Sequence, residues 1–189
     1  MLSWSELLTG QPNAPEVSKI KPGEAPMEEL DPQQQLRLAE RVYATLQVGQ
    51  EMGPWERVLT PEDVRAYAAA IDDENPWYLR DSAQEPTVCH PAMTAPFGIW
   101  LFQETRSKIL GDPVPPLVGV HTAAYHHYTN PVPVGKRLIV HGKVVDKYIR
   151  SQRYYVVVEF WTVDEDGRDI VHITDTFLLT PVRIPQKAD

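Results

Sequence analysis

The sequence predicts an α+β domain in which an antiparallel sheet curls around one long apolar helix. Two observations support this fold class. A long run of apolar residues at helical spacing ends at Leu110, and four segments that follow residue 116 alternate with a period of two. Because the sheet must cover a single long apolar helix, we expect it to curl around that helix.

Composition limits the classes of function. A chain of 189 residues is long enough to bury one core, and its net charge of -8 argues against a nucleic-acid partner. No apolar run reaches the roughly 18 residues that a membrane span needs, so no membrane partner is expected. Cys89 is the only cysteine, which excludes an internal disulfide. With no secretory signal in its first residues, the sequence predicts a cytoplasmic location.

Residues 1–49 are a predicted N-terminal arm, and residues 50–185 are the predicted main domain. Five prolines between residues 11 and 32 disfavour regular structure in most of the arm. From Asp31 the pattern changes, because Asp31 can cap a helix and Pro32 suits its first position. Apolar residues then recur at roughly helical spacing: Leu36, Leu38, Val42, Tyr43 and Leu46. We expect a short helix there, packed on its own domain or on a second subunit.

Residues 51–59 are predicted to enter the main domain as a strand, and a helix follows Thr60. Thr60 and Asp63 have the spacing of a capping box, with Pro61 at the first helical position. The spacing predicts one buried stripe: Val64, Tyr67, Ala68 and Ile71. Pro76 prevents the helix from resuming. A loop is therefore expected to carry Asp73, Asn75 and Tyr78.

The long helix follows His90 and carries large apolar side chains: Met93, Phe97, Trp100, Leu101, Ile109 and Leu110. Gly111 is its expected C-terminal cap. Pro96 leaves two alternatives for its start. Either Thr94 caps a helix whose first turn holds Pro96, or the helix starts earlier and is kinked at Pro96.

Four strands are predicted over residues 117–128, 137–148, 154–163 and 170–179, with a hairpin turn at residues 164–167. The third strand is largely apolar on both faces, which places it at the centre of the sheet or at an interface.

Histidines gather on the first of these strands. Strict alternation puts His121, Tyr125 and His127 on one face, and His126 and Tyr128 on the other. Because their spacing matches no structural zinc motif, we interpret them as lining a sheet face or a subunit interface.

Four segments, in the correct order, resemble one known family. Asp73, Asn75 and Pro76 match its Asp-x-Asn-Pro-x-His motif, and residues 89–91 stand at the head of its central helix. Residues 128–136 resemble its Arg-Pro-Val-x-x-Gly-Asp connection, and residues 157–179 resemble its closing hairpin. Over about residues 50–182 the chain therefore resembles the MaoC-like branch of the hot-dog fold, which includes (R)-specific enoyl-CoA hydratases and acyl dehydratases.

The resemblance implies addition of water to an enoyl-CoA thioester, or its removal from a 3-hydroxyacyl-CoA. In the family an aspartate and a histidine activate the water together. Here Tyr78 stands at the histidine position, and a phenol with a reference pKa of about 10 is a poor base. Pro91 stands where the family has a glycine whose N–H is thought to bind the thioester carbonyl, and proline has no N–H.

On this resemblance we expect Asp73 to be the base, Tyr78 a proton donor or substrate anchor, and His90 the acid partner. The alternatives are local roles, in which His90 caps the helix and Asp73 ends its own helix beside an Asx turn at Asn75. Neither a cofactor nor a metal is expected. The residues expected to contact substrate are Asn75, Pro76, Cys89, Pro91, Met93 and Trp100.

The sequence leaves three functions open. The predicted function is that of an acyl-CoA hydratase or dehydratase with an altered site. Alternatively, the chain is a non-catalytic subunit that binds acyl-CoA beside a catalytic MaoC-like partner, or a thioesterase in which Asp73 activates water against the thioester. Because family members pair their sheets, the resemblance implies a homodimer or a heterodimer with another hot-dog subunit, and an acyl-CoA thioester as ligand.

Overall fold

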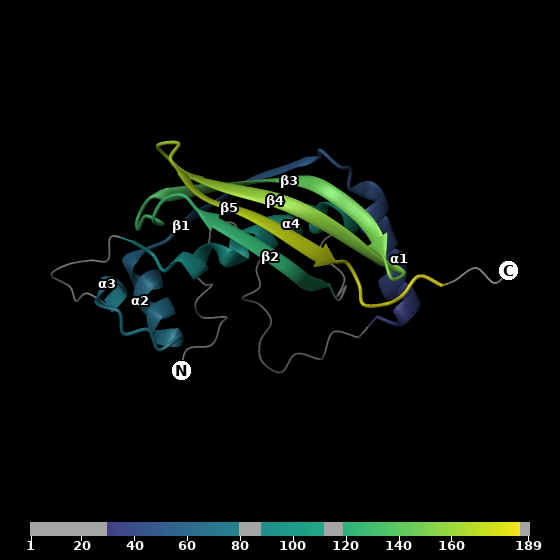
Figure 1. Ribbon diagram of the computed structural model, residues 1–189, viewed down its shortest axis with the longest axis horizontal. Coiled ribbons are helices and arrows are strands. Elements are labelled where there is room, and N and C mark those ends of the chain that lie inside the picture. Colours follow the sequence, from purple (N-terminus) through teal and green to yellow (C-terminus); the bar gives the residue numbers. More distant parts are fainter. Residues whose placement is uncertain (1–29, 80–87, 112–118, 186–189) are drawn as a thin grey trace.

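A computed structural model describes residues 30–79, 88–111 and 119–185 (Figure 1). Within them, five strands form one antiparallel sheet in the order β1-β3-β4-β5-β2, which arches over helix α4. Figure 1 shows α2 and α3 near one end of the sheet and α1 near the other. The elements are α1 (Pro32–Thr45), β1 (Glu51–Val58), α2 (Pro61–Ala70), α3 (Pro76–Leu79), η3 (Pro91–Thr94), α4 (Ala95–Leu110), β2 (Val120–Tyr128), β3 (Arg137–Arg150), β4 (Arg153–Asp164) and β5 (Asp169–Leu178).

The predicted α+β class, a curled antiparallel sheet around a long central helix, is confirmed. The proline-rich residues 1–29 of the predicted arm lie outside the described residues, as do the first residues of the strand predicted from 117. No helix in the described ranges is both long and apolar enough to cross a membrane.

Helix α1 begins and ends on specific hydrogen bonds. The side chain of Asp31 accepts the N–H of Gln34 at 2.9 Å, and the Gln34 side chain accepts the N–H of Asp31, which is a capping box. At the other end, Lys147 on β3 donates to the carbonyls of Tyr43 and Leu46. Three residues of this segment are fully buried: Ala39, Val42 and Leu46. The predicted helix is confirmed, and it packs on the core of its own chain.

Helix α2 begins with the predicted capping box, in which Thr60 Oγ1 accepts the N–H of Asp63 at 3.1 Å and the Asp63 carboxylate accepts the N–H of Thr60. Its buried stripe is narrower than predicted. Val64 and Ala68 are fully buried, but Ile71 is 43% exposed because the helix ends at Ala70.

The loop predicted after α2 contains a short helix. Pro76 begins α3 rather than only ending α2, because proline fits the first position of a helix. The side chain of Asn75 accepts the N–H of Trp77 at 3.0 Å, so it caps this turn. The prediction that Tyr78 lies on a loop is therefore wrong, since Tyr78 belongs to α3.

The start of α4 follows the first of the two alternatives. Thr94 is the N-cap residue and Pro96 lies in the first turn. A short 3-10 helix, η3, leads into it and is capped by His90. Gly111 ends α4 with a φ of 96°, as predicted for a C-terminal cap.

Strand β4 occupies the centre of the sheet, as its two apolar faces predicted. On its inner face Phe160 fills the space between α4 and the sheet. A Cβ atom added to Gly98 on α4 would lie 2.6 Å from the Phe160 ring, and one added to Gly142 on β3 would lie 2.8 Å from it. The absence of two side chains thus sets how closely the helix approaches the sheet.

Strand β2 contains a bulge that the sequence does not reveal. Its pairing with β5 slips by one residue between His121 and Ala123. Directly opposed residues share a face, so His121 and His126 both lie on the inner face with their β5 partners Phe177 and Ile173. The prediction that the two histidines occupy opposite faces is wrong, because the bulge reverses the alternation.

We expect Gly98→Ala to lower the free energy of unfolding by about 1–2 kcal/mol in urea titrations. Overpacking against Phe160 costs about 1–3 kcal/mol, and the better helix propensity of alanine offsets up to about 1 kcal/mol. Ser107→Ala on the same helix is the control and should change stability by less than about 0.5 kcal/mol. Equal stabilities for Gly98→Ala and the unmodified protein would contradict the close contact.

Candidate functional site

Asp73, Tyr78 and His90 lie together near the N-terminal end of α4. Asp73 follows α2, where its N–H donates to the carbonyl of Ala68 at 2.9 Å. Asp73 Oδ2 lies 4.0 Å from His90 Nε2, and both side chains are about one quarter exposed. A ligand can therefore reach the pair.

The histidine has a defined orientation. His90 Nδ1 accepts the N–H of Ala92 at 3.1 Å, so in the neutral imidazole the proton belongs to Nε2, which faces Asp73. The rings of Tyr67 and Tyr78 lie 5.3 and 5.4 Å from the His90 ring. His90 thus caps η3 through one nitrogen and presents an N–H to the site through the other.

The phenol of Tyr78 keeps its proton in this environment. Burial raises the pKa of its phenol, and the negative charge of Asp73 raises it further. The phenol therefore stays protonated at neutral pH and cannot serve as a base.

Asn75 and Pro76 shape the loop that holds Asp73. Asp73 Oδ1 accepts the N–H of Asn75 at 2.9 Å, and both Asn75 and Pro76 are exposed. Asp73 thus fixes its own loop with one carboxylate oxygen and presents the other to His90. The local role and the role toward His90 are compatible.

The backbone donors at the start of η3 are already engaged. Pro91 has no N–H, the N–H of Ala92 is bonded to His90 Nδ1, and the N–H of Met93 donates to the His90 carbonyl at 3.0 Å. Residues 91–93 therefore leave no backbone N–H to bind a thioester oxygen.

The geometry and the sequence agree with one family. A family model described as "FAS1-like, dehydratase domain region" matches residues 46–173, more than half of the chain. The chain belongs to this dehydratase family. No curated protein matches the sequence.

Solved structures share the fold of this dehydratase-family chain. The HadBC complex of Mycobacterium tuberculosis, a 3R-hydroxyacyl-ACP dehydratase, is 15% identical over 71% of this chain and 98% of its own, with a TM-score of 0.60. The R-hydratase PhaJ1 of Pseudomonas aeruginosa is 19% identical over 78% and 91%, with a TM-score of 0.52. The (R)-hydratase of A. caviae is 20% identical over 71% and 98%, with a TM-score of 0.51. The predicted hot-dog fold is confirmed.

Two of the predicted substrate-contacting residues, Cys89 and Met93, belong to the core, and a third, Trp100, is partly buried against it. Cys89 is 3% exposed and its N–H donates to the carbonyl of Val132 at 2.8 Å. Met93 is buried, and Trp100 packs against Trp55 with ring centroids 5.2 Å apart. Cys89 nevertheless interacts electrostatically with Tyr78 and contributes to the raised pKa of the Tyr78 phenol.

Tyr67, Thr94 and Tyr128 stand at the site, and the sequence did not identify them as site residues. The Tyr128 hydroxyl donates to the Pro91 carbonyl at 2.8 Å and lies 3.2 Å from Thr94 Oγ1. Tyr67 was predicted as core because it shares the helical stripe of α2. No local pattern marks these residues, since their contacts depend on how α2, β2 and η3 come together.

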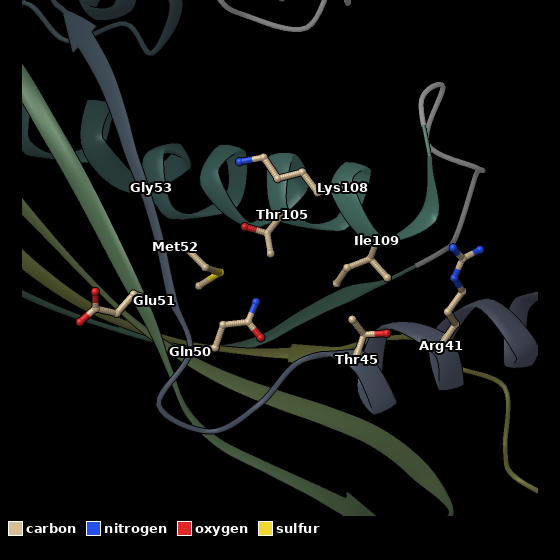
Figure 2. A pocket seen from close by; sticks show the side chains of 9 residues that line it. All are labelled: Arg41, Thr45, Gln50, Glu51, Met52, Gly53, Thr105, Lys108 and Ile109. Carbon is tan, nitrogen blue, oxygen red and sulfur yellow. The ribbon is translucent and has the colours of Figure 1, made fainter.

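A hollow lies away from the predicted site residues Asp73, Tyr78 and His90. It measures about 360 Å³ and is bounded by α1, the start of β1 and the C-terminal half of α4 (Figure 2). Its lining is Arg41, Thr45, Gln50, Glu51, Met52, Gly53, Thr105, Lys108 and Ile109. Lys108 is paired with Glu104 at 2.8 Å. Across the described residues, no cluster of three His, Cys, Asp or Glu side chains suits a metal ion.

We expect Cys89 to resist alkylation in the folded protein. Burial raises the pKa of its thiol to about 12, so almost no thiolate exists at pH 8, and the sulfur is sterically covered. Mass spectrometry after iodoacetamide treatment at pH 8 should find no adduct in buffer and one adduct in urea. Rapid labelling in buffer would show that the segment holding Cys89 opens.

Proposed function

We propose that this dehydratase-family chain adds water to an enoyl thioester, or removes it from a 3-hydroxyacyl thioester, at the Asp73–His90 pair. The supporting observation is the 4.0 Å separation of Asp73 Oδ2 and His90 Nε2 in a partly open site. That separation exceeds a direct hydrogen bond, and a water molecule beside it can contact both groups.

Asp73 is the base of the proposed reaction. As the water oxygen bonds to C3 of the enoyl group, Asp73 Oδ2 takes one water proton, and the C2–C3 electron pair moves onto C2 and the thioester carbonyl. C2 then takes the proton from the Asp73 carboxyl. One water is added, and Asp73 returns to its starting state. The dehydration follows the same steps in reverse.

His90 and Tyr78 act as hydrogen-bond donors in this scheme. Because His90 Nδ1 already accepts the N–H of Ala92, the neutral tautomer of the ring has its proton on Nε2. The resemblance leads us to expect His90 as the acid. In this proposal His90 instead orients the water through its Nε2–H. In this proposal the protonated phenol of Tyr78, whose ring lies 5.4 Å from that of His90, binds the thioester.

A specific observation favours a second function, a binding subunit beside a catalytic hot-dog partner. Residues 91–93 leave no backbone N–H for the thioester oxygen, which weakens stabilisation of the transition state. Strand β2 is an edge of the sheet whose Val120 and Tyr125 are exposed, which suits pairing with another subunit. One structural neighbour, HadBC of Mycobacterium tuberculosis, is itself a complex.

The test is hydration of crotonyl-CoA, followed by loss of its enoyl absorbance. We expect the unmodified chain to consume the enoyl group and Asp73→Asn to be about 10²–10⁴-fold slower, because the variant lacks the base. Glu74→Gln, an exposed neighbouring carboxylate, is the matched control and should retain full activity.

Other outcomes separate the alternatives. Persistent absorbance together with a higher melting temperature in crotonyl-CoA would favour the binding subunit over the hydratase. Release of free CoA thiol would instead indicate a thioesterase.

A further inference from the structure

A cavity of about 330 Å³ lies on the inner side of the sheet, between α4, the start of β2 and the end of β5. Its apolar walls include Ile99, Phe102, Phe177 and Leu179. Three polar side chains, Gln103, Arg106 and His121, also line it, and none of the described lining residues is acidic. The cavity thus combines apolar walls with a region suited to an anion.

His121 contacts two side chains of β5 at the cavity wall. Its Nε2 lies 2.9 Å from Asp175 Oδ1, and its ring stacks on Phe177 with centroids 5.1 Å apart and planes 17° from parallel. Phe177 in turn stacks on Phe102 at 4.4 Å. Within the described part of the chain, Nδ1 of His121 has no partner, and the side chain is 31% exposed. With a proton on both ring nitrogens, His121 can donate from Nε2 to Asp175 and from Nδ1 to a ligand.

Asp175 behind His121 has no evident structural purpose. Its side chain is fully buried, and among the described residues neither carboxylate oxygen makes a hydrogen bond of regular geometry, although Oδ1 lies 2.9 Å from His121 Nε2. Burial raises its pKa, while the nearby His121 and His126 act in the opposite direction. A buried carboxylate with an unsatisfied oxygen is unfavourable for stability, which points to a role in orienting His121.

Arg106 brings positive charge to the same cavity from α4. The residue is 7% exposed, and burial lowers the pKa of its guanidinium without removing the charge at neutral pH. A carboxylate can accept hydrogen bonds from a guanidinium and an imidazole together, and such charge-assisted bonds are strong.

We propose that this cavity binds a carboxylate at the end of an apolar chain, with Arg106 and His121 contacting the anion and Asp175 as the positioning residue for His121. The carboxylate can belong to a free fatty acid. It can also be the far end of an acyl chain whose thioester lies at Asp73 and His90, and that source rests on the proposed function. The span of α4 from Ala95 to Arg106 is about 16 Å at 1.5 Å per residue.

Calorimetric titration with straight-chain carboxylates from hexanoate to hexadecanoate, each against the alcohol of equal length, tests the site. We expect at least one carboxylate to bind about 10-fold or more tightly than its alcohol. His121→Gln should weaken binding of the carboxylate about 10-fold and leave binding of the alcohol unchanged. Arg106→Lys keeps the charge with a different geometry and should give a smaller loss.

Asp175→Asn tests the positioning role. It should reduce the preference for carboxylate over alcohol while alcohol affinity stays constant, a change that a purely structural role would not produce. Tyr125→Phe, at an exposed position further along β2, is the matched control and should bind like the unmodified protein.

Three outcomes of these titrations would overturn the proposal. Absence of carboxylate binding, or equal binding by the unmodified protein and His121→Gln, would overturn the proposal. Weakening by Asp73→Asn but not by His121→Gln would place the ligand at the first site and would also overturn it.

The source of the carboxylate is tested by turnover. A faster reaction for an enoyl-CoA with a terminal carboxylate than for its unsubstituted analogue, lost in His121→Gln, assigns the carboxylate to the substrate. Carboxylate binding without that preference assigns it to a free acid. If no enoyl-CoA reacts, the proposed function fails, but the binding result still supports this site.

Discussion

The contact between α4 and the sheet sets the position of every other feature. Phe160 fills the space between Gly98 and Gly142, and neither position has room for a side chain. The helix therefore lies at a fixed height under the sheet, with η3 and His90 at one end and Arg106 near the other. The loop after α2 brings Asp73 to the first of these points. The cavity beside His121 opens at the second.

Local chemistry was predictable from the sequence, and non-local register was not. Capping by Asp31 and Thr60, and the end of α4 at Gly111, follow from residues close in sequence to each backbone group, so a linear pattern contains them. The β2 bulge depends on pairing with β5, about fifty residues further along the chain. Simple alternation therefore placed His121 and His126 on opposite faces, although both lie on the inner face. The family resemblance identified Asp73, Tyr78 and His90 as site residues. The neighbouring Tyr128 reaches the site only through tertiary packing, so no local pattern identifies it.

Two aspartate–histidine pairs occupy contrasting environments. Asp73 and His90 are partly open and separated by 4.0 Å, which leaves their polar atoms accessible to water. Asp175 is fully buried and lies 2.9 Å from His121, so that pair is preformed. An accessible, separated pair suits proton transfer to a reactant, while a buried, closely held pair suits recognition by a fixed imidazole.

The unit that folds differs from the unit that sequence comparison recognises. The family match begins at residue 46, after α1 has ended, yet Ala39 and Val42 of α1 are fully buried in the same core, and Lys147 of β3 binds the end of that helix. A chain cut where the recognisable family begins would expose apolar surface of the core and leave an ammonium group without its carbonyl partners. The bounds of the family match therefore underestimate the length of chain that folds as one cooperative unit.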